Sequence, residues 1–208
     1  MKQLIRLFLF SLIMLSLAGC SFSNSFNGIN EDNPTKTKDD NEITEIKIYK
    51  GEKLDILVVG DNPNIREKKN ISFTNINLEN LTKRNLDRYD AVFIMPKYLS
   101  ETSEKRYNKI YKQSKIPFFF VGSKASTIPF VDNSEVTYET YADRVDESQT
   151  YISGLLYKEN DKGYFAYKYR YLHNGKNFVK DNVSSIYSNV FRTIESIKDK
   201  RGDGSSAS

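Results

Sequence analysis

Three apolar runs mark the middle of the chain. They span residues 54–60 (LDILVVG), 91–95 (AVFIM) and 116–123 (IPFFFVGS). Continuous apolar runs of this length, bounded by turn-forming residues, are typical of strands that are buried on both faces of a sheet. Residues 71–78 (ISFTNINL) alternate less regularly between apolar and polar side chains, and they predict a fourth, weaker strand.

Helical patterns lie between these strands. Residues 80–87 predict a short helix, and Ser100 is placed to cap a second helix over residues 101–113. This second helix has apolar residues at helical spacing: Tyr107, Ile110 and Tyr111. Strands that alternate with helices favour a mostly parallel sheet joined by right-handed crossovers. Residues 61–70 are the exception, because they hold at most about two helical turns.

The C-terminal third changes to a hairpin followed by a helix. Residues 149–157 and 163–172 flank a polar turn and predict two antiparallel strands. Residues 177–198 predict a helix that packs onto the sheet, because apolar side chains recur three or four positions apart: Val179, Val183, Ile186, Val190, Ile194 and Ile197. The predicted fold class is therefore α/β: a mostly parallel sheet flanked by helices in three layers, with a C-terminal β-hairpin and a packed C-terminal helix.

One strand of the predicted hairpin carries an aromatic row. Phe165, Tyr167, Tyr169 and Tyr171 occupy alternate positions and fall on one face of the strand. Such a row is most often the inward face of an antiparallel strand under a helix, and we favour this interpretation. The alternative is an exposed row beside basic residues that binds a glycan or a partner chain.

The N-terminus has the layout of an export signal. Lys2 and Arg6 precede an apolar run at residues 7–17, which is too short to span a membrane because a spanning helix needs about 20 apolar residues. The segment ends in the tetrapeptide LAGC at residues 17–20, which resembles the lipobox of bacterial lipoproteins. The resemblance implies that a diacylglycerol is attached to the Cys20 thiol and that the peptide is cut before this residue.

Four regions follow from these patterns. Residues 1–19 are predicted to be a lipoprotein signal peptide, residues 20–45 the lipidated cysteine with a flexible polar spacer, residues 46–199 a single α/β domain, and residues 200–208 a disordered tail. The lipid predicts a protein anchored at the outer, extracytoplasmic face of a bacterial cell membrane. The spacer is expected to separate the folded domain from the anchor.

Charge and cysteine content narrow the classes of partner and chemistry. Loss of residues 1–19 removes two basic groups and lowers the formal net charge from +4 to +2, which argues against a nucleic-acid partner. Cys20 is the only cysteine, so we expect no disulfide and no thiolate metal site. His173 is the only histidine and the carboxylates are not clustered, so we predict no metal and no cofactor.

The order of elements in residues 54–123 and the phrase YDAVFI at residues 89–94 form a recognisable pattern. They resemble the flavodoxin-like layout that receiver domains share with the class I glutamine amidotransferase-like fold. The resemblance implies a ligand site beyond the carboxyl ends of the strands. The catalytic residues of these families are absent: Pro96 follows the second buried strand where a receiver has aspartate, the only cysteine is the predicted lipid anchor, and Gly60 stands outside any dinucleotide-binding glycine pattern.

Polar side chains at the predicted strand ends form the candidate site. Asp61, Asn62, Lys97 and Ser123 are candidates for ligand binding. Asp61, Ser123 and Lys124 are also the candidates for catalysis, because a serine activated by a neighbouring lysine or aspartate is a nucleophile. We favour the simpler interpretation, in which Asp61 and Ser123 satisfy backbone groups and Lys124 lies in solvent. No catalytic residue is therefore assigned.

The leading hypothesis is a non-enzymatic lipoprotein of the cell envelope whose α/β domain is a binding or accessory module for a ligand, an envelope protein or a cell-wall partner. It rests on the predicted anchor, the spacer and the absence of a catalytic set. One alternative is an envelope α/β hydrolase that uses the strand-end residues. A second alternative is a purely structural surface protein.

Overall fold

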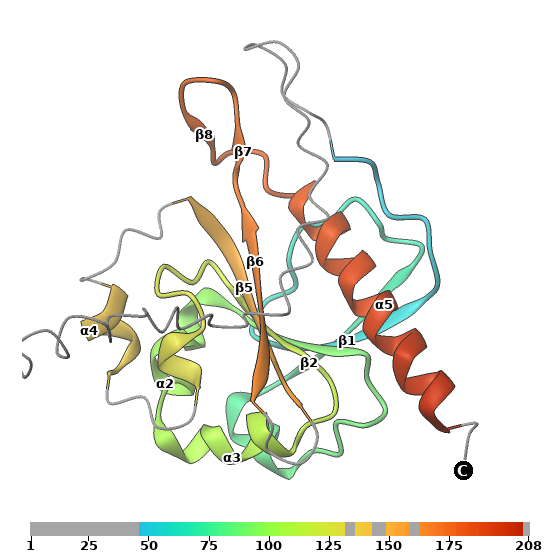
Figure 1. Ribbon diagram of the computed structural model, residues 1–208, viewed down its shortest axis with the longest axis vertical. Coiled ribbons are helices and arrows are strands. Elements are labelled where there is room, and N and C mark those ends of the chain that lie inside the picture. The colour runs from blue at the N-terminus through green and yellow to red at the C-terminus, as the bar shows by residue number, and fades with distance from the viewer. Residues whose placement is uncertain (1–45, 132–135, 143–148, 159–162, 206–208) are drawn as a thin grey trace, which may run out of the picture.

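A six-stranded sheet forms the centre of the protein (Figure 1). The computed structural model describes residues 46–131, 136–142, 149–158 and 163–205. Neighbouring strands follow the order β2-β1-β3-β4-β5-β6, with these bounds: β1 (Leu54–Val59), β2 (Ile71–Ile76), β3 (Ala91–Ile94), β4 (Phe118–Val121), β5 (Thr150–Tyr157) and β6 (Tyr164–Arg170). The first four strands are parallel, and β5 and β6 are antiparallel to their neighbours. The predicted α/β class with a mostly parallel sheet is confirmed.

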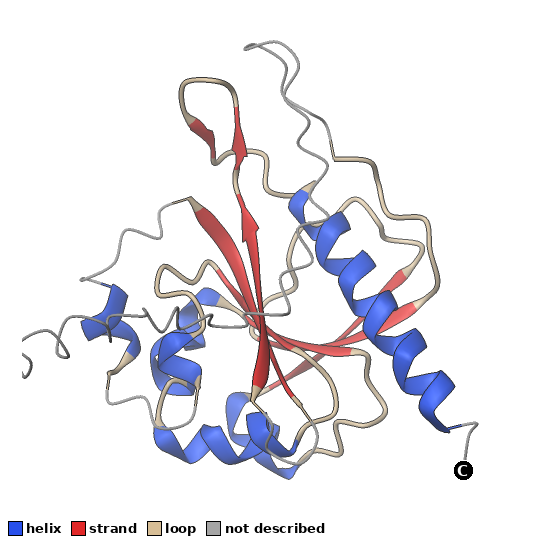
Figure 2. Cartoon of the chain, in the orientation of Figure 1, coloured by secondary structure: helices blue, strands red, loops and turns tan. Residues whose placement is uncertain are grey.

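Helices cover both faces of the sheet and give the predicted three layers (Figure 2). On one face, which we call the α5 face, helix α5 (Ile186–Ser205) packs on alternate strand positions such as Ile56 and Phe93. The other face, which we call the α3 face, buries the intervening positions such as Leu57 and Phe120. It is covered by short elements: the 3₁₀ helices η1 (Leu78–Lys83) and η3 (Ile128–Phe130) and the helices α2 (Leu99–Thr102) and α3 (Lys105–Gln113). Burial on both sides explains the continuous apolar runs of the central strands.

The order of the first five strands, 2-1-3-4-5, is that of flavodoxin-like sheets. β5 nevertheless runs antiparallel to β4, because the chain enters β5 beside the end of β4, with Ile152 opposite Val121. The hairpin predicted from residues 149–157 and 163–172 is confirmed as β5 and β6. It extends the main sheet and does not stand apart from it.

On the α3 face, two helices differ from the ones that the sequence predicts. The helix expected over residues 101–113 is divided into α2 and α3, and Ser100 lies inside α2 without forming a side-chain cap. The break lies at Glu104, whose backbone is extended with φ −68° and ψ 144°, and the Thr102 hydroxyl donates to the Tyr98 carbonyl oxygen at 2.7 Å in the turn before it. The helix expected over residues 80–87 is instead the 3₁₀ helix η1, which begins earlier in the chain.

The C-terminal helix begins at Ile186, whereas the sequence pattern predicts a helix over residues 177–198. The start of that span belongs to a second small hairpin, β7 (Leu172–His173) paired with β8 (Phe178–Val179). Asn174 closes its turn, because the side-chain oxygen accepts two bonds, at 3.1 and 2.7 Å, from backbone N–H groups that follow it. Such local bonds compete with helix formation and override the apolar spacing.

Helix α5 also continues further than predicted. It ends at Ser205, so the first part of the tail that was expected from residue 200 is helical. Asp90, in the turn before β3, fastens this end of the helix. Its carboxylate lies 3.3 Å from Lys198 Nζ and 3.7 Å from an Arg201 guanidinium nitrogen. These contacts order residues that have little apolar surface of their own.

The aromatic row of β6 faces the core. Tyr167 and Tyr169 pack against Phe119, with ring centroids 6.3 and 6.0 Å apart, and burial raises the pKa of Tyr167 to about 12. Tyr171 packs against the same core beneath α5. The interpretation of the row as an inward face is confirmed for these three residues.

The signal peptide, Cys20 and the spacer lie outside the described residues. Lipid anchoring is therefore a prediction from sequence alone. Within the described ranges, no helix is long and apolar enough to cross a membrane.

Candidate functional site

The carboxyl ends of three parallel strands meet at one edge of the sheet. Gly60, directly after β1, has φ +116°, and a Cβ at this position would lie 2.9 Å from Met95 Cβ. Gly122, directly after β4, has φ +71°, and its Cβ would lie 3.1 Å from Pro96 Cγ. Both turns require glycine, because other residues rarely adopt these angles. The chain order reverses between β1 and β3, so this edge is the topological switch point at which open α/β sheets bind ligands.

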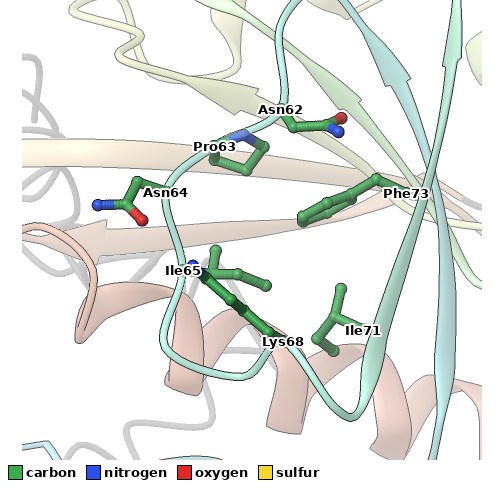
Figure 3. A pocket seen from close by; sticks show the side chains of 7 residues that line it. All are labelled: Asn62, Pro63, Asn64, Ile65, Lys68, Ile71 and Phe73. Atoms are coloured by element: carbon green, nitrogen blue, oxygen red, sulfur yellow. The ribbon is translucent and has the colours of Figure 1, made fainter.

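A first hollow of about 380 Å³ lies between the β1–β2 loop and strand β2 (Figure 3). The loop supplies one side and the strand supplies the other, and the lining residues are Asn62, Pro63, Asn64, Ile65, Lys68, Ile71 and Phe73. Figure 3 shows the Phe73 ring directed toward the loop, with Asn62 beside it. The hollow therefore combines one aromatic ring with carboxamide groups and a single cation.

A second hollow of about 280 Å³ lies on the other side of the same loop. Its lining comes from the ends of several elements and shares two residues with the first hollow: Pro63, Asn64, Met95, Tyr151, Asp181, Asn182, Val183, Ser184 and Tyr187. Met95 follows β3, Tyr151 lies at the start of β5, and residues 181–184 lead into α5. This hollow thus occupies the switch point itself. We call the two hollows and their shared wall the crevice.

Hydrogen bonds hold the wall of the crevice in place. Asn75 Nδ2 donates to the Gly60 carbonyl oxygen at 2.7 Å and to Asn62 Oδ1 at 2.9 Å. Further along the loop, the buried Glu67 carboxylate accepts a bond from the Ser188 hydroxyl of α5. The β1–β2 connection has no helix, but hydrogen bonds join its first residues to β2 and its later residues to α5.

Two phenols face each other in the second hollow. Tyr151 Oη and Tyr187 Oη lie 3.2 Å apart, and the two rings are nearly perpendicular, at 87°. Burial raises the pKa of Tyr187, so its phenol stays protonated at neutral pH. Two phenols need only one O–H for the bond between them, so the second O–H is left to donate to another group.

The residues that the sequence predicts to bind a ligand lie in different surroundings in the structure. Asn62 lines the first hollow, whereas Asp61, Lys97 and Ser123 line neither hollow. Asp61 and Lys97 are exposed, and Lys97 Nζ lies 5.6 Å from the centre of the Tyr98 ring. A role for these two residues in ligand binding stays a prediction.

The catalytic candidates are not brought together. Ser123 is completely buried, and its hydroxyl donates to the Ser126 carbonyl oxygen at 3.0 Å. Lys124 is exposed, and its backbone N–H donates to Tyr138 Oη at 3.2 Å. Among the described residues, no hydrogen bond or ion pair joins Asp61, Ser123 and Lys124. The geometry agrees with the simpler interpretation, in which Ser123 satisfies a backbone group where a strand ends.

Most residues of the crevice carry no signal in the sequence. The turn at Gly60 marks the loop, so Asn62 could be found, but Phe73 and Met95 look like ordinary core residues. Tyr151 lies in a predicted strand, and Asn182 falls inside the residues predicted as helix. Their common location follows only from the tertiary fold.

Neither a metal site nor a relative indicates the function. In the part of the chain that the structure describes, no group of three or more His, Cys, Asp or Glu side chains is arranged to hold a metal ion. His173 is exposed at the end of β7, and its ring lies edge-on to Phe178 of β8, with the ring centroids 5.1 Å apart. No family model, no curated protein and no solved structure matches the chain.

Proposed function

We propose that this protein is a lipid-anchored binding module at the outer face of a bacterial cell membrane, and that its ligand occupies the crevice at the switch point. The lipobox-like tetrapeptide at residues 17–20 supports the anchor on Cys20. The two hollows and their ordered wall support the binding role. The ligand is a component of the cell envelope, because that is the compartment which the anchor implies.

The observation that carries this proposal is the nature of the crevice lining. Ligand sites are preformed concavities of about 300–1,000 Å³, few per protein and preferentially at switch points. The crevice offers amides, hydroxyls and aromatic rings at such a place. Ser184 is its one aliphatic hydroxyl, and it donates to Asn182 Oδ1 at 3.2 Å. The Ser184 hydroxyl is thus paired with a carboxamide, which is not a general base, and not with Asp181, the one carboxylate of the lining, so the lining supports binding better than nucleophilic catalysis.

Cys20→Ser in the full chain tests the anchor. We expect the unmodified protein to incorporate radiolabelled palmitate and to sediment with membranes. The variant should lose both properties, because only a thiolate forms the thioether to the diacylglycerol. Ser21→Ala is the matched control and should behave like the unmodified protein. A Cys20→Ser protein that remains membrane-bound and still carries lipid would contradict the anchor.

Asn64→Trp tests the crevice, because this exposed residue lies on the wall that the two hollows share and a bulky side chain there changes the shape of the crevice. The probe is a library of small neutral, anionic and cationic compounds, and the readout is the amide chemical shifts of the isotope-labelled full chain. We expect hits to shift residues 62–68 and 181–184, and Asn64→Trp to abolish these shifts. Asn77→Trp, at an exposed asparagine after β2, is the control. Hits that bind only elsewhere would refute the site.

A further inference from the structure

We propose that the crevice binds an uncharged, polyhydroxylated ring compound, that is, a carbohydrate. The inference rests on the proposed binding function and names the class of ligand. Three features of the lining carry it: an aromatic ring in each hollow, carboxamides with free donors beside the rings, and the balance of charge.

Each hollow contains an aromatic ring that is held in place and still partly open. Phe73 packs against Phe93 at 6.4 Å and points toward the loop (Figure 3). Tyr151 packs against Tyr171 at 5.3 Å and against Tyr187 at 5.9 Å. Phe73 and Tyr151 are only half-buried. The electron-rich face of such a ring attracts the partly positive C–H groups of a sugar ring, as it attracts the edge of another aromatic ring.

Carboxamides stand beside these rings with their oxygens already engaged. Asn62 Oδ1 accepts a bond from Asn75 at 2.9 Å, and Asn182 Oδ1 accepts one from the Ser184 hydroxyl at 3.2 Å. Their Nδ2 groups keep two N–H bonds each, and no hydrogen bond from them to a described residue is present, so they can donate to a ligand. A sugar hydroxyl both accepts and donates, so it matches these amides as well as the spare O–H of the phenol pair.

The charges in the crevice oppose an ionic ligand. Lys68 is the only cation of the first hollow, and Asp181 is the only anion of the second. Phosphate and carboxylate ligands are typically held by bidentate arginines, and neither lining contains an arginine. A ligand that spans both hollows meets one charge of each sign, and this favours a neutral molecule.

The polar lining also opposes a purely apolar ligand. Such a ligand would displace water from the carboxamides without replacing the hydrogen bonds. A buried polar group left without a partner weakens binding. A molecule with apolar C–H faces and hydroxyl edges avoids this penalty while it still covers the rings of Phe73 and Tyr151.

Titration calorimetry on the full chain tests the ligand class. The chain is held in a zwitterionic detergent, because a detergent with a sugar headgroup would compete. The probes are neutral trisaccharides of glucose and of N-acetylglucosamine, trigalacturonate as an anionic sugar, inorganic phosphate, and indole as an apolar ring. We expect a neutral trisaccharide to bind and to shift the amides of residues 62–68 and 181–184. Co-sedimentation with the insoluble polysaccharide of the same sugar distinguishes a polymer ligand from a free one.

Two variants locate the contacts. Asn182→Ala removes a donor, and Phe73→Leu removes the ring face while it keeps apolar volume so that the strand still packs. Each should weaken binding of the neutral trisaccharide by about 3- to 10-fold, as expected for one lost interaction of about 0.5–1.5 kcal/mol. The controls are Asn77→Ala and Tyr164→Ala, an exposed asparagine and an exposed aromatic residue outside the crevice. They should bind with unchanged affinity.

The outcomes separate this inference from the proposed function. If only trigalacturonate, phosphate or indole shifts the amide signals of the crevice, the ligand is not a neutral carbohydrate, but the binding function stands. If a trisaccharide binds equally well to Asn182→Ala and Phe73→Leu, the carbohydrate contacts have been misplaced and the inference is wrong. Both the inference and the proposed function fail if no probe shifts the amide signals of the crevice. This applies to the panel above and to the compound library of the Asn64→Trp experiment.

Discussion

The two faces of the sheet are packed in different ways. On the α3 face, four short helical elements converge, and the rings of Phe120 and Phe130 stack with centroids 3.7 Å apart. On the α5 face, a single helix of 20 residues lies over the strands, and the ring of Phe93 stands 5.7–6.4 Å from its aromatic neighbours. The lining of both hollows includes core residues of the α5 face, among them Phe73 and Tyr187.

The difference has a geometric cause. Strands in a sheet are spaced about 4.8 Å apart, so six of them span roughly 24 Å, whereas one helix with its side chains is about 10 Å wide. One helix therefore leaves part of the α5 face to loops. The segments at residues 62–68 and 181–184 fill that part incompletely, and the crevice is the space that remains. In the function that we propose, the filled α3 face is the support and the ligand binds on the α5 face.

Removal of one buried ring from each face should have the largest effect. Phe93→Ala and Phe120→Ala should each lower the free energy of unfolding by about 3–5 kcal/mol, because both rings are completely buried and each substitution leaves a cavity. Urea denaturation followed by circular dichroism measures the loss. If Phe93→Ala costs far less than Phe120→Ala, the α5 face is loose throughout and not only at the crevice.

Glu67→Ala should separate the loop from α5. Glu67 is 3% exposed and accepts bonds from the Tyr49 backbone N–H at 3.3 Å and from the Ser188 hydroxyl. Its loss leaves buried donors unpaired, so we expect about 2–3 kcal/mol less stability in urea denaturation. Glu67→Gln keeps an oxygen acceptor and should cost clearly less. Equal losses in the two variants would show that one amide oxygen cannot replace the two carboxylate oxygens that accept the bonds of this wall.

Alkaline pH should weaken both faces through their buried tyrosines. Burial raises the pKa of Tyr111 on the α3 face and of Tyr187 on the α5 face above the ordinary value of 10.0. Above pH 10 the unfolded chain loses these protons while the folded chain keeps them, so stability falls by up to about 1.4 kcal/mol per pH unit for each tyrosine. Below pH 10 both states are protonated and the effect is absent.

Tyr111→Phe and Tyr187→Phe test this pH dependence separately. Each variant should reduce the stability that is lost between pH 9 and pH 11 by about 1.4 kcal/mol in total, measured by urea denaturation. A slope that changes for Tyr111→Phe but not for Tyr187→Phe would mean that solvent reaches the Tyr187 phenol through the crevice. That result would make the contrast between the two faces sharper than the structure indicates.

Ser123→Ala should have the smallest effect. The buried hydroxyl makes one hydrogen bond, to Ser126, so the substitution should cost about 1 kcal/mol in urea denaturation. It should leave any hydrolysis of p-nitrophenyl acetate by the full chain unchanged. A loss of esterase activity with the fold intact would favour the hydrolase alternative. Asp61→Ala changes an exposed residue outside the crevice, and its stability and esterase activity are measured for comparison with Ser123→Ala.

The central strands could be predicted because nearly every residue in them is buried. β1, β3 and β4 are covered on both sides, so their sequences are continuous apolar runs that need no tertiary information to recognise. The ends of the helices could not be predicted as well. The break between α2 and α3 lies at the extended backbone of Glu104, which no apolar pattern marks. The end of α5 is held by Asp90, which lies more than a hundred residues earlier in the chain.

The sequence by itself determined the fold class, the parallel core strands, the hairpin of β5 and β6, and the prediction of a lipid on Cys20. Each of these depends on local composition or on a short motif. Only the tertiary structure decided the candidate site, because the crevice brings Asn64, Met95, Tyr151 and Asn182 together from four separate segments. Tertiary structure also buried Ser123 away from the other catalytic candidates. Strand order and the coverage of each face set these positions, and no local pattern of residues encodes either of them.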